Sequence, residues 1–331
     1  MRRLLCLCAV LLVVTHASAA TGFGCYAYLR DVGGLENWRA HVRLMKQSGM
    51  NTFAIVWRGS RELREQLDIA VEEGMLEKTV PIFLIGENGP DQFKAELAAA
   101  DYERMKQLDP KPLSGFGSGD IAGTAALVAI ARKDARHAAD WPELIMYNYD
   151  EPGHGDPAAD LTAVGEVTAA YNAQGFRCGT AIEWPNIERA ALLLDVLACS
   201  IIIGGDLGQT KTTIACCQKE FWAYEIHLST RASPELVRWH IGYWMWQAQP
   251  KSHLSWNWVG YLGKNFDKAN PRMTPRLEAY AQGRRDFEYL TAMEATLKTM
   301  RASFDWEGWP VKGHAAEGFD YKPPPLALPA W

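Results

Sequence analysis

The segment MYNYDEPGHG (146–155) places two carboxylates side by side, at the point where a strand-like run of residues stops. Asp150 and Glu151 are followed directly by Pro152 and Gly153, which break the run. Neighbouring like charges repel, so one carboxyl group of such a pair holds its proton more tightly than the other. The coincidence of strand end, carboxylate pair and turn indicates catalysis. The alternative is an acidic cluster that stabilises the start of the next helix.

The elements that must position this pair follow a repeating order along the chain. Short apolar runs rich in β-branched and aromatic residues alternate with amphipathic stretches of helical periodicity. This order predicts eight strands at 22–29, 51–57, 79–86, 143–150, 176–184, 196–205, 220–227 and 253–261. The predicted helices span 35–49, 60–74, 91–108, 124–139, 160–175, 186–194, 210–218, 233–249 and 274–300. Eight strand–helix units in order predict an α/β fold, a single (β/α)8 TIM barrel.

In such barrels the chemistry lies at the carboxyl ends of the strands. The carboxylate pair ends the fourth predicted strand. Because side chains alternate along a strand, we expect Met146, Asn148 and Asp150 to point into the barrel, with Tyr147 and Tyr149 towards the helices. Glu151 lies beyond the last regular position, where it can turn over the barrel mouth.

The first twenty residues have the pattern of a secretory signal peptide. Arg2 and Arg3 precede the apolar run LLCLCAVLLVV (4–14) and the small-residue cleavage pattern of THASAA (15–20). The apolar run is too short to span a bilayer. We therefore expect a signal peptide at 1–20, a barrel at 21–303, an irregular Pro-rich tail at 304–331, and a secreted or periplasmic protein with no membrane span in the mature chain.

Composition excludes some partners and favours another. Without the two signal arginines, 32 basic residues face 39 acidic ones, a net charge of about −7, and no basic stripe indicates nucleic-acid binding. The five cysteines outside the signal have no metal-ligand spacing, so we expect no metal and no cofactor, and Cys178 and Cys199 are expected in the core. Thirteen tryptophans favour a carbohydrate partner, because the apolar face of a sugar stacks on aromatic rings.

The chain resembles the barrel domain of glycoside hydrolase family 123 and the related domain of unknown function 4091. The resemblance rests on GGLENWRAHVRLMKQSGMNTFAIVW, YNYDEPG, EFWAYE, RWHIGYWMWQAQ, LSWNW and RLEAYAQGRRDFEYL, which lie between residues 22 and 295. It implies hydrolysis of a β-linked N-acetyl-hexosaminide, of the N-acetylgalactosamine type, by substrate assistance. Glu151 would then be the general acid and base, while Asp150 would hold the acetamido N–H so that the acetamido oxygen attacks the anomeric carbon.

Two alternatives stay open. Glu225 ends the seventh predicted strand, where retaining glycosidases of the large barrel clan carry their nucleophile, so Glu151 and Glu225 could act together by double displacement. The barrel could instead bind carbohydrate without cleaving it.

Further residues near strand ends are candidates for binding the sugar. Tyr224 could hydrogen-bond an acetamido oxygen or simply pack. The tryptophans could wall a sugar pocket or belong to the core, and Glu183 could bond sugar hydroxyls or cap a helix. The full set is Tyr224, Trp184, Trp256, Trp57, Asn148, Glu225 and Glu183.

Overall fold

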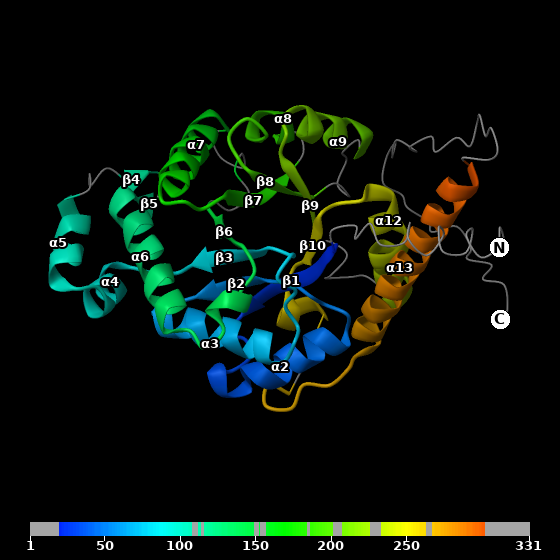
Figure 1. Ribbon diagram of the computed structural model, residues 1–331, viewed down its shortest axis with the longest axis horizontal. Coiled ribbons are helices and arrows are strands. Elements are labelled where there is room, and N and C mark those ends of the chain that lie inside the picture. Colours follow the sequence, from blue (N-terminus) through cyan, green and yellow to red (C-terminus); the bar gives the residue numbers. More distant parts are fainter. Residues whose placement is uncertain are drawn as a thin grey trace, which may run out of the picture.

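A closed barrel of parallel strands forms the centre of the molecule, with helices around it (Figure 1). The computed structural model describes residues 20–107, 112–113, 116–148, 152, 157–183, 186–200, 207–225, 233–262 and 267–301. The strands follow the order β1, β2, β3, β6, β7, β8, β9 and β10, which closes on β1. They are Gly22–Tyr28, Ala54–Trp57, Ile82–Gly86, Leu144–Tyr147, Cys178–Glu183, Val196–Ser200, Glu220–Glu225 and Ser252–Ser255. The predicted (β/α)8 barrel is confirmed.

Helices follow the strands of the barrel; all but the last two connect consecutive strands. They are α2 (Leu35–Gln47), α3 (Gly59–Glu72), α7 (Pro157–Ala173), α8 (Ile187–Ala190), α9 (Leu207–Cys216), α11 (Pro234–Trp239), η2 (His240–Trp244), α12 (Met245–Ala248), η3 (Trp258–Leu262) and α13 (Pro275–Arg301). The long connection from β3 to β6 holds α4 (Pro90–Glu96), α5 (Ala99–Gln107), the short strands β4 (Pro112–Leu113) and β5 (Phe116–Gly117), α6 (Ser118–Asp134) and the turn η1 (Ala138–Asp140). The predicted helix 91–108 is thus two helices, and α6 begins six residues earlier than predicted.

Small and large side chains together fill the inside of the barrel. Phe83 and Trp222 pack with ring centroids 4.5 Å apart. Gly179 leaves them room, because a Cβ atom there would lie 2.6 Å from the Phe83 ring. The inner layer consists of Tyr26, Ala54, Phe83, Ile145, Ala181, Val196, Ala198, Trp222, Tyr224 and Leu254. The alternate strand positions pack outwards against the helices, among them the buried thiols of Cys25, Cys178 and Cys199. The expectation that Cys178 and Cys199 belong to the core is confirmed.

The predicted facing of β6 is wrong. Tyr147, rather than Met146, points into the barrel, where its ring lies 6.0 Å from Tyr26 and 5.7 Å from Phe83. Met146 belongs to the outer core. Asn148 is 1% exposed, and its Nδ2 donates to Thr168 Oγ1 on α7 at 2.7 Å. The helix side offers Asn148 a hydrogen-bond partner, whereas the inner layer is apolar and aromatic.

The last predicted strand is shorter than expected. β10 ends at Ser255, and the chain then turns into the π-helical segment η3. Trp258 is fully buried there and donates its Nε1 to His41 Nδ1 at 2.9 Å. The buried indole ends the strand because its partner lies on α2, outside the barrel wall.

Two buried histidines, one on β10 and one on η2, lie against each other. His240 Nε2 and His253 Nε2 are 3.1 Å apart, and His240 stacks on Trp244 with a centroid distance of 4.5 Å. Burial lowers the pKa of His253 to about 3, and it also lowers the pKa of His240 well below its usual value. Both rings are therefore neutral at physiological pH.

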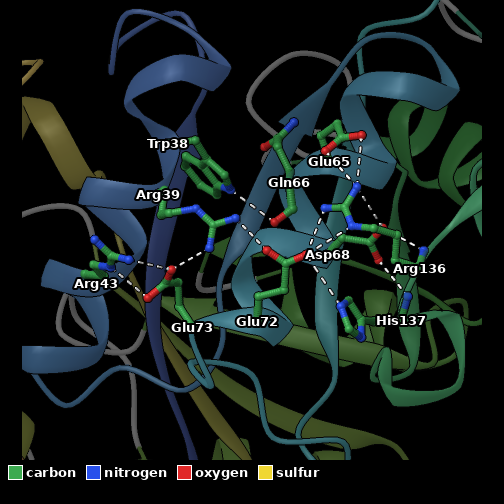
Figure 2. A network of polar contacts seen from close by, with 10 residues as sticks. All are labelled: Trp38, Arg39, Arg43, Glu65, Gln66, Asp68, Glu72, Glu73, Arg136 and His137. Atoms are coloured by element: carbon green, nitrogen blue, oxygen red, sulfur yellow. Dashed lines mark hydrogen bonds and ion pairs between the residues drawn. The ribbon is translucent and has the colours of Figure 1, made fainter.

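A polar network joins α2, α3 and the turn before η1 (Figure 2). At its centre, the carboxylate of Asp68 is completely buried and accepts hydrogen bonds from the backbone N–H groups of Arg136 and His137 at 2.9 Å and 3.2 Å. Around it, Arg136 pairs with Glu65 and Glu72 near the protein surface. The network fixes the chain as it enters β6, the strand that leads to the carboxylate pair.

Candidate functional site at the barrel mouth

Aromatic side chains gather at the carboxyl ends of β1, β6, β9 and β10. Tyr26 lies at the centre of the group, with ring centroid distances of 5.4 Å to Tyr224 and 5.1 Å to Trp256. Trp256 also meets Tyr28 edge-on at 5.8 Å. Tyr26 and Tyr224 are buried, whereas Tyr28, Tyr147 and Trp256 are half-buried. The half-buried rings form an upper layer that is accessible from the mouth, and the buried rings close the barrel below them.

The structure thus brings two of the predicted binding residues, Tyr224 and Trp256, to the inner face of the mouth. It adds Tyr26, Tyr28 and Tyr147, which sequence analysis did not select. Tyr26 and Tyr28 occupy alternate positions on the first strand, and this spacing was the signal that could have found them.

Two predicted binding residues face away from the mouth. Trp57 ends β2, is completely buried and belongs to the outer core between strands and helices. Its inner-facing neighbour is Ala54 three positions earlier, so the alternation of β2 directs Trp57 outwards. Asn148 likewise serves α7, as described above. The prediction that Trp57 forms part of a sugar pocket is therefore wrong, because its side chain points towards the helices. The side chain of Asn148 points the same way, so the corresponding prediction for Asn148 is wrong as well.

The carboxylate pair itself, Asp150 and Glu151, lies outside the described residues, as does Trp184. The residues on either side of the pair are described. Asn148 is anchored on α7, and the buried Pro152 accepts a long hydrogen bond of 3.5 Å from Asn186 Nδ2, at the start of α8. The chain is thus held on both sides of the pair, at the carboxyl end of the barrel.

The backbone places the other two acidic candidates at strand ends. Glu183 is the last residue of β7 and pairs in register with Ser200. Glu225 is the last residue of β9 and pairs in register with Ser255, the residue before Trp256. Both positions lie on the same edge of the barrel as the aromatic group.

Charged side chains tie together the loops that follow β1, β2 and β3. Glu87 accepts hydrogen bonds from Arg58 Nη2 at 2.6 Å and from Arg30 Nη1 at 3.5 Å. The Arg30 guanidinium lies 5.0 Å above the centroid of the Tyr28 ring, so this ion cluster adjoins the aromatic group. Nearby on α3, burial raises the pKa of Glu62, while a hydrogen bond from the Arg58 backbone opposes that rise. These pairs stabilise the rim of the mouth.

Within the described part of the chain, no cluster of three or more His, Cys, Asp and Glu side chains could hold a metal ion. Nor does any helix of that part have the length and apolar character needed to cross a membrane.

Comparison with known proteins identifies the fold. No family model matches the chain, and a search of curated proteins finds no match. Solved structures of glycoside hydrolases do match. An endo-β-1,4-mannanase from Thermotoga petrophila has a TM-score of 0.53 at 9% identity, over 82% of this chain and 78% of the mannanase. GH5_18 from Streptomyces cattleya in complex with GlcNAc has a TM-score of 0.51 at 14% identity, over 82% of this chain and 81% of that protein. A Bacteroidetes-affiliated GH5 cellulase has a TM-score of 0.51 at 12% identity, over 86% and 96%. The chain has the barrel fold of these hydrolases.

Proposed function

We propose that this protein is an exported glycoside hydrolase that cleaves a β-linked N-acetyl-hexosaminide, of the N-acetylgalactosamine type. The observation that carries the proposal is the position of the Asp150–Glu151 pair. In the sequence, the pair lies between Asn148, which follows β6, and Pro152. These two described residues are hydrogen-bonded to α7 and to Asn186, and in this fold chemistry occurs at the carboxyl ends of the strands. The resemblance to glycoside hydrolase family 123 supports the assignment of the two carboxyl groups.

Roles follow from the chemistry of substrate assistance. Glu151 protonates the glycosidic oxygen and later takes a proton from water. Asp150, ionised, accepts the N–H of the 2-acetamido group, so that the acetamido oxygen attacks the anomeric carbon. Mutual repulsion separates the two pKa values, which suits one neutral and one charged carboxyl group.

The aromatic group supports a carbohydrate substrate. Trp256 and Tyr28 present half-buried rings on which the apolar face of a pyranose can stack. The hydroxyl of Tyr224, deeper in the barrel, is the candidate donor to the acetamido oxygen. GH5_18 from Streptomyces cattleya has the same fold and was crystallised with GlcNAc, so a barrel of this architecture can accommodate an N-acetylated sugar.

A second mechanism is favoured by the position of Glu225. Its place at the end of β9, in register with Ser255, is the strand end from which a carboxylate nucleophile could act with Glu151 as the acid. A retaining pair of this kind needs its carboxyl groups ~5–5.5 Å apart. Glu183 and Trp184, after β7, are further candidates for binding the sugar. A barrel that binds carbohydrate without cleaving it is the third possibility.

Activity measurements separate these functions. Purified protein is assayed with aryl N-acetyl-β-galactosaminide and N-acetyl-β-glucosaminide. We expect hydrolysis, strong inhibition by an N-acetyl-hexosamine thiazoline, and no covalent label from a 2-deoxy-2-fluoro glycoside. Asp150→Asn should abolish most turnover, and Glu225→Gln should cost much less. A fluoro-sugar adduct on Glu225 would transfer the nucleophile to that residue, and sugar binding without hydrolysis would leave only the binding barrel.

A further inference from the structure

Three charged side chains meet on the rim of the barrel mouth, one from each of three consecutive loops. Arg30 follows Tyr28, the last residue of β1, by two positions, Arg58 comes directly after β2, and Glu87 comes directly after β3. Glu87 Oε2 accepts from Arg58 Nε at 3.1 Å and from Arg58 Nη2 at 2.6 Å, while Glu87 Oε1 accepts from Arg30 Nη1 at 3.5 Å. We call Arg30, Arg58 and Glu87 the rim cluster.

The loops after β2 and β3 are fastened to each other through their backbones. Glu87 N donates to Trp57 O at 3.0 Å, and Gly59 N donates to Asn88 Oδ1 at 2.7 Å. These two bonds flank the Arg58–Glu87 pair, so the pair is held in place before any ligand arrives. A polar pair that is already fixed loses less entropy when a ligand binds to it.

The rim cluster has hydrogen-bonding groups that its internal pairing does not use. The side chains of Arg30 and Arg58 are 62% and 60% exposed. Within the described part of the chain, Arg30 Nη2 and Arg58 Nη1 make no hydrogen bond. A sugar hydroxyl can accept a hydrogen bond from a guanidinium and donate its own to a carboxylate such as that of Glu87. The cluster thus offers both kinds of partner that a sugar hydroxyl needs.

The order of the strands places the rim cluster next to the candidate site. β3, which Glu87 follows, is the neighbour of β6, the strand that leads to the carboxylate pair. Neighbouring strands lie ~4.8 Å apart, so the loops after β3, β2 and β1 cover ~10 Å of the rim, starting beside β6. At its far end the cluster adjoins the aromatic group, since the Arg30 guanidinium lies above Tyr28, whose ring meets Trp256.

The charges around the rim cluster favour a neutral sugar over an acidic one. Asp31 Oδ1 lies 4.0 Å from Arg30 Nε, so two carboxylates, those of Asp31 and Glu87, balance the two guanidinium groups. Glu62 on α3 adds a further carboxyl group near Arg58. A sulfate or a uronate would therefore meet no excess of positive charge among the described residues of this rim, and it would be repelled by Glu87.

We propose that the rim cluster binds a neutral pyranose next to the sugar that lies at the carboxylate pair. Arg30 and Arg58 donate hydrogen bonds to hydroxyl oxygens of this second sugar, and Glu87 accepts hydrogen bonds from its hydroxyl groups. The substrate is then an oligosaccharide or polysaccharide that extends from β6 along the rim towards β1. The inference rests on the carbohydrate substrate of the proposed function, and its test does not require that this substrate is cleaved.

Binding measurements with saccharides of different length test the proposal. Isothermal titration calorimetry on the natural chain compares methyl N-acetyl-β-galactosaminide with a β-linked N-acetylgalactosamine disaccharide. In the disaccharide, sulfur replaces the glycosidic oxygen, so that it resists hydrolysis. Because hydrogen bonds to charged groups are strong, we expect the disaccharide to bind ~10-fold more tightly than the monosaccharide. In Arg58→Ala and in Glu87→Ala, this advantage of the disaccharide should fall to ~2-fold or less.

Arg43→Ala is the matched control. Arg43 is 65% exposed, and its Nε lies 2.8 Å from Glu73, so it forms an exposed ion pair like that of Arg58. Glu73 follows the last residue of α3, at the opposite end of this helix from Arg58. The control variant should therefore keep the full advantage of the disaccharide.

Several results would overturn the proposal. They are no gain from the second sugar, a gain that survives in either rim variant or is lost equally in the control, and no binding of any saccharide. Tighter binding of the same disaccharide with a sulfate ester would also overturn it, since the ligand would then be an anion. Hydrolysis of aryl N-acetyl-β-galactosaminide, measured in parallel, tests only the proposed function. Hydrolysis without a gain from the second sugar keeps that function and removes the second sugar site, and a gain without hydrolysis does the reverse.

Discussion

Replacing the buried carboxylate of Asp68 should destabilise the protein strongly. Asp68 accepts hydrogen bonds from Arg136 N at 2.9 Å and His137 N at 3.2 Å (Figure 2). It also accepts one from Trp141 Nε1 at 3.0 Å, and its side chain is completely buried. In Asp68→Ala all three donors lose their acceptor. A hydrogen bond to a charged group contributes ~1.5–3 kcal/mol, but the three share one carboxylate and do not add, so we expect a loss of ~4 kcal/mol.

Urea unfolding followed by tryptophan fluorescence measures this loss, and thermal unfolding should show Tm lower by ~10 °C. Asp68→Asn keeps one acceptor oxygen and should lose ~2 kcal/mol. Arg43→Ala is the matched control. It removes a side chain that is 65% exposed and pairs with Glu73 in the same network, so its loss should stay below ~1 kcal/mol. If Asp68→Ala unfolds at the same urea concentration as the Arg43 control, the carboxylate does not stabilise the turn before η1 and this reasoning is refuted.

Three further predictions concern the site and the buried histidines. Glu151→Gln should slow hydrolysis by ~10²–10⁴-fold, and most for substrates with poor leaving groups, since these need protonation. Equal losses for good and poor leaving groups would show that Glu151 is not the general acid. Trp256→Ala should raise KM with little loss of stability, because its ring is half-buried at the mouth. Trp57→Ala should instead lower the free energy of unfolding by ~3–5 kcal/mol, because Trp57 belongs to the core. Enzyme kinetics and urea unfolding that show the opposite pattern would exchange the roles of the two tryptophans. Burial lowers the pKa of His253 to about 3. Below about pH 6.5 the folded state therefore binds fewer protons than the unfolded state. The stability that comes from the neutral ring is lost as the pH falls from about 6.5 towards 3. Between pH 7 and pH 5, the free energy of unfolding of His253→Gln should therefore fall by ~2 kcal/mol less than that of the natural chain. Urea unfolding at both pH values measures this difference, and the same pH dependence in both proteins would contradict the prediction.

Periodicity predicted the eight strands well because each strand is a short apolar run between turn residues. It failed where a contact distant in sequence decided the local structure. SWNWVGY (255–261) has the composition of a strand, yet the chain leaves the barrel at Ser255 because Trp258 finds its acceptor on His41, more than two hundred residues earlier. No local pattern carries that information.

The facing of side chains shows the same limit. Alternation fixes which residues of a strand share a face, but not which face points into the barrel. The prediction correctly separates Tyr147 from Met146 and Asn148, but it places the wrong group inside the barrel. The deciding partner, Thr168 on α7, comes twenty residues after Asn148.

The corrected facing of β6 changes how the carboxylate pair should be tested. β6 ends at Tyr147, and Asp150 and Glu151 lie outside the described residues, so the alternation of the strand assigns no facing to either carboxylate. The acid role of Glu151 therefore depends on the leaving-group test. The role of Asp150 requires in addition that the turn at Pro152, held near Asn186, carry its carboxylate to the acetamido group. Asp150→Asn is thus the more demanding test of substrate assistance, because it depends on the turn as well as on the chemistry.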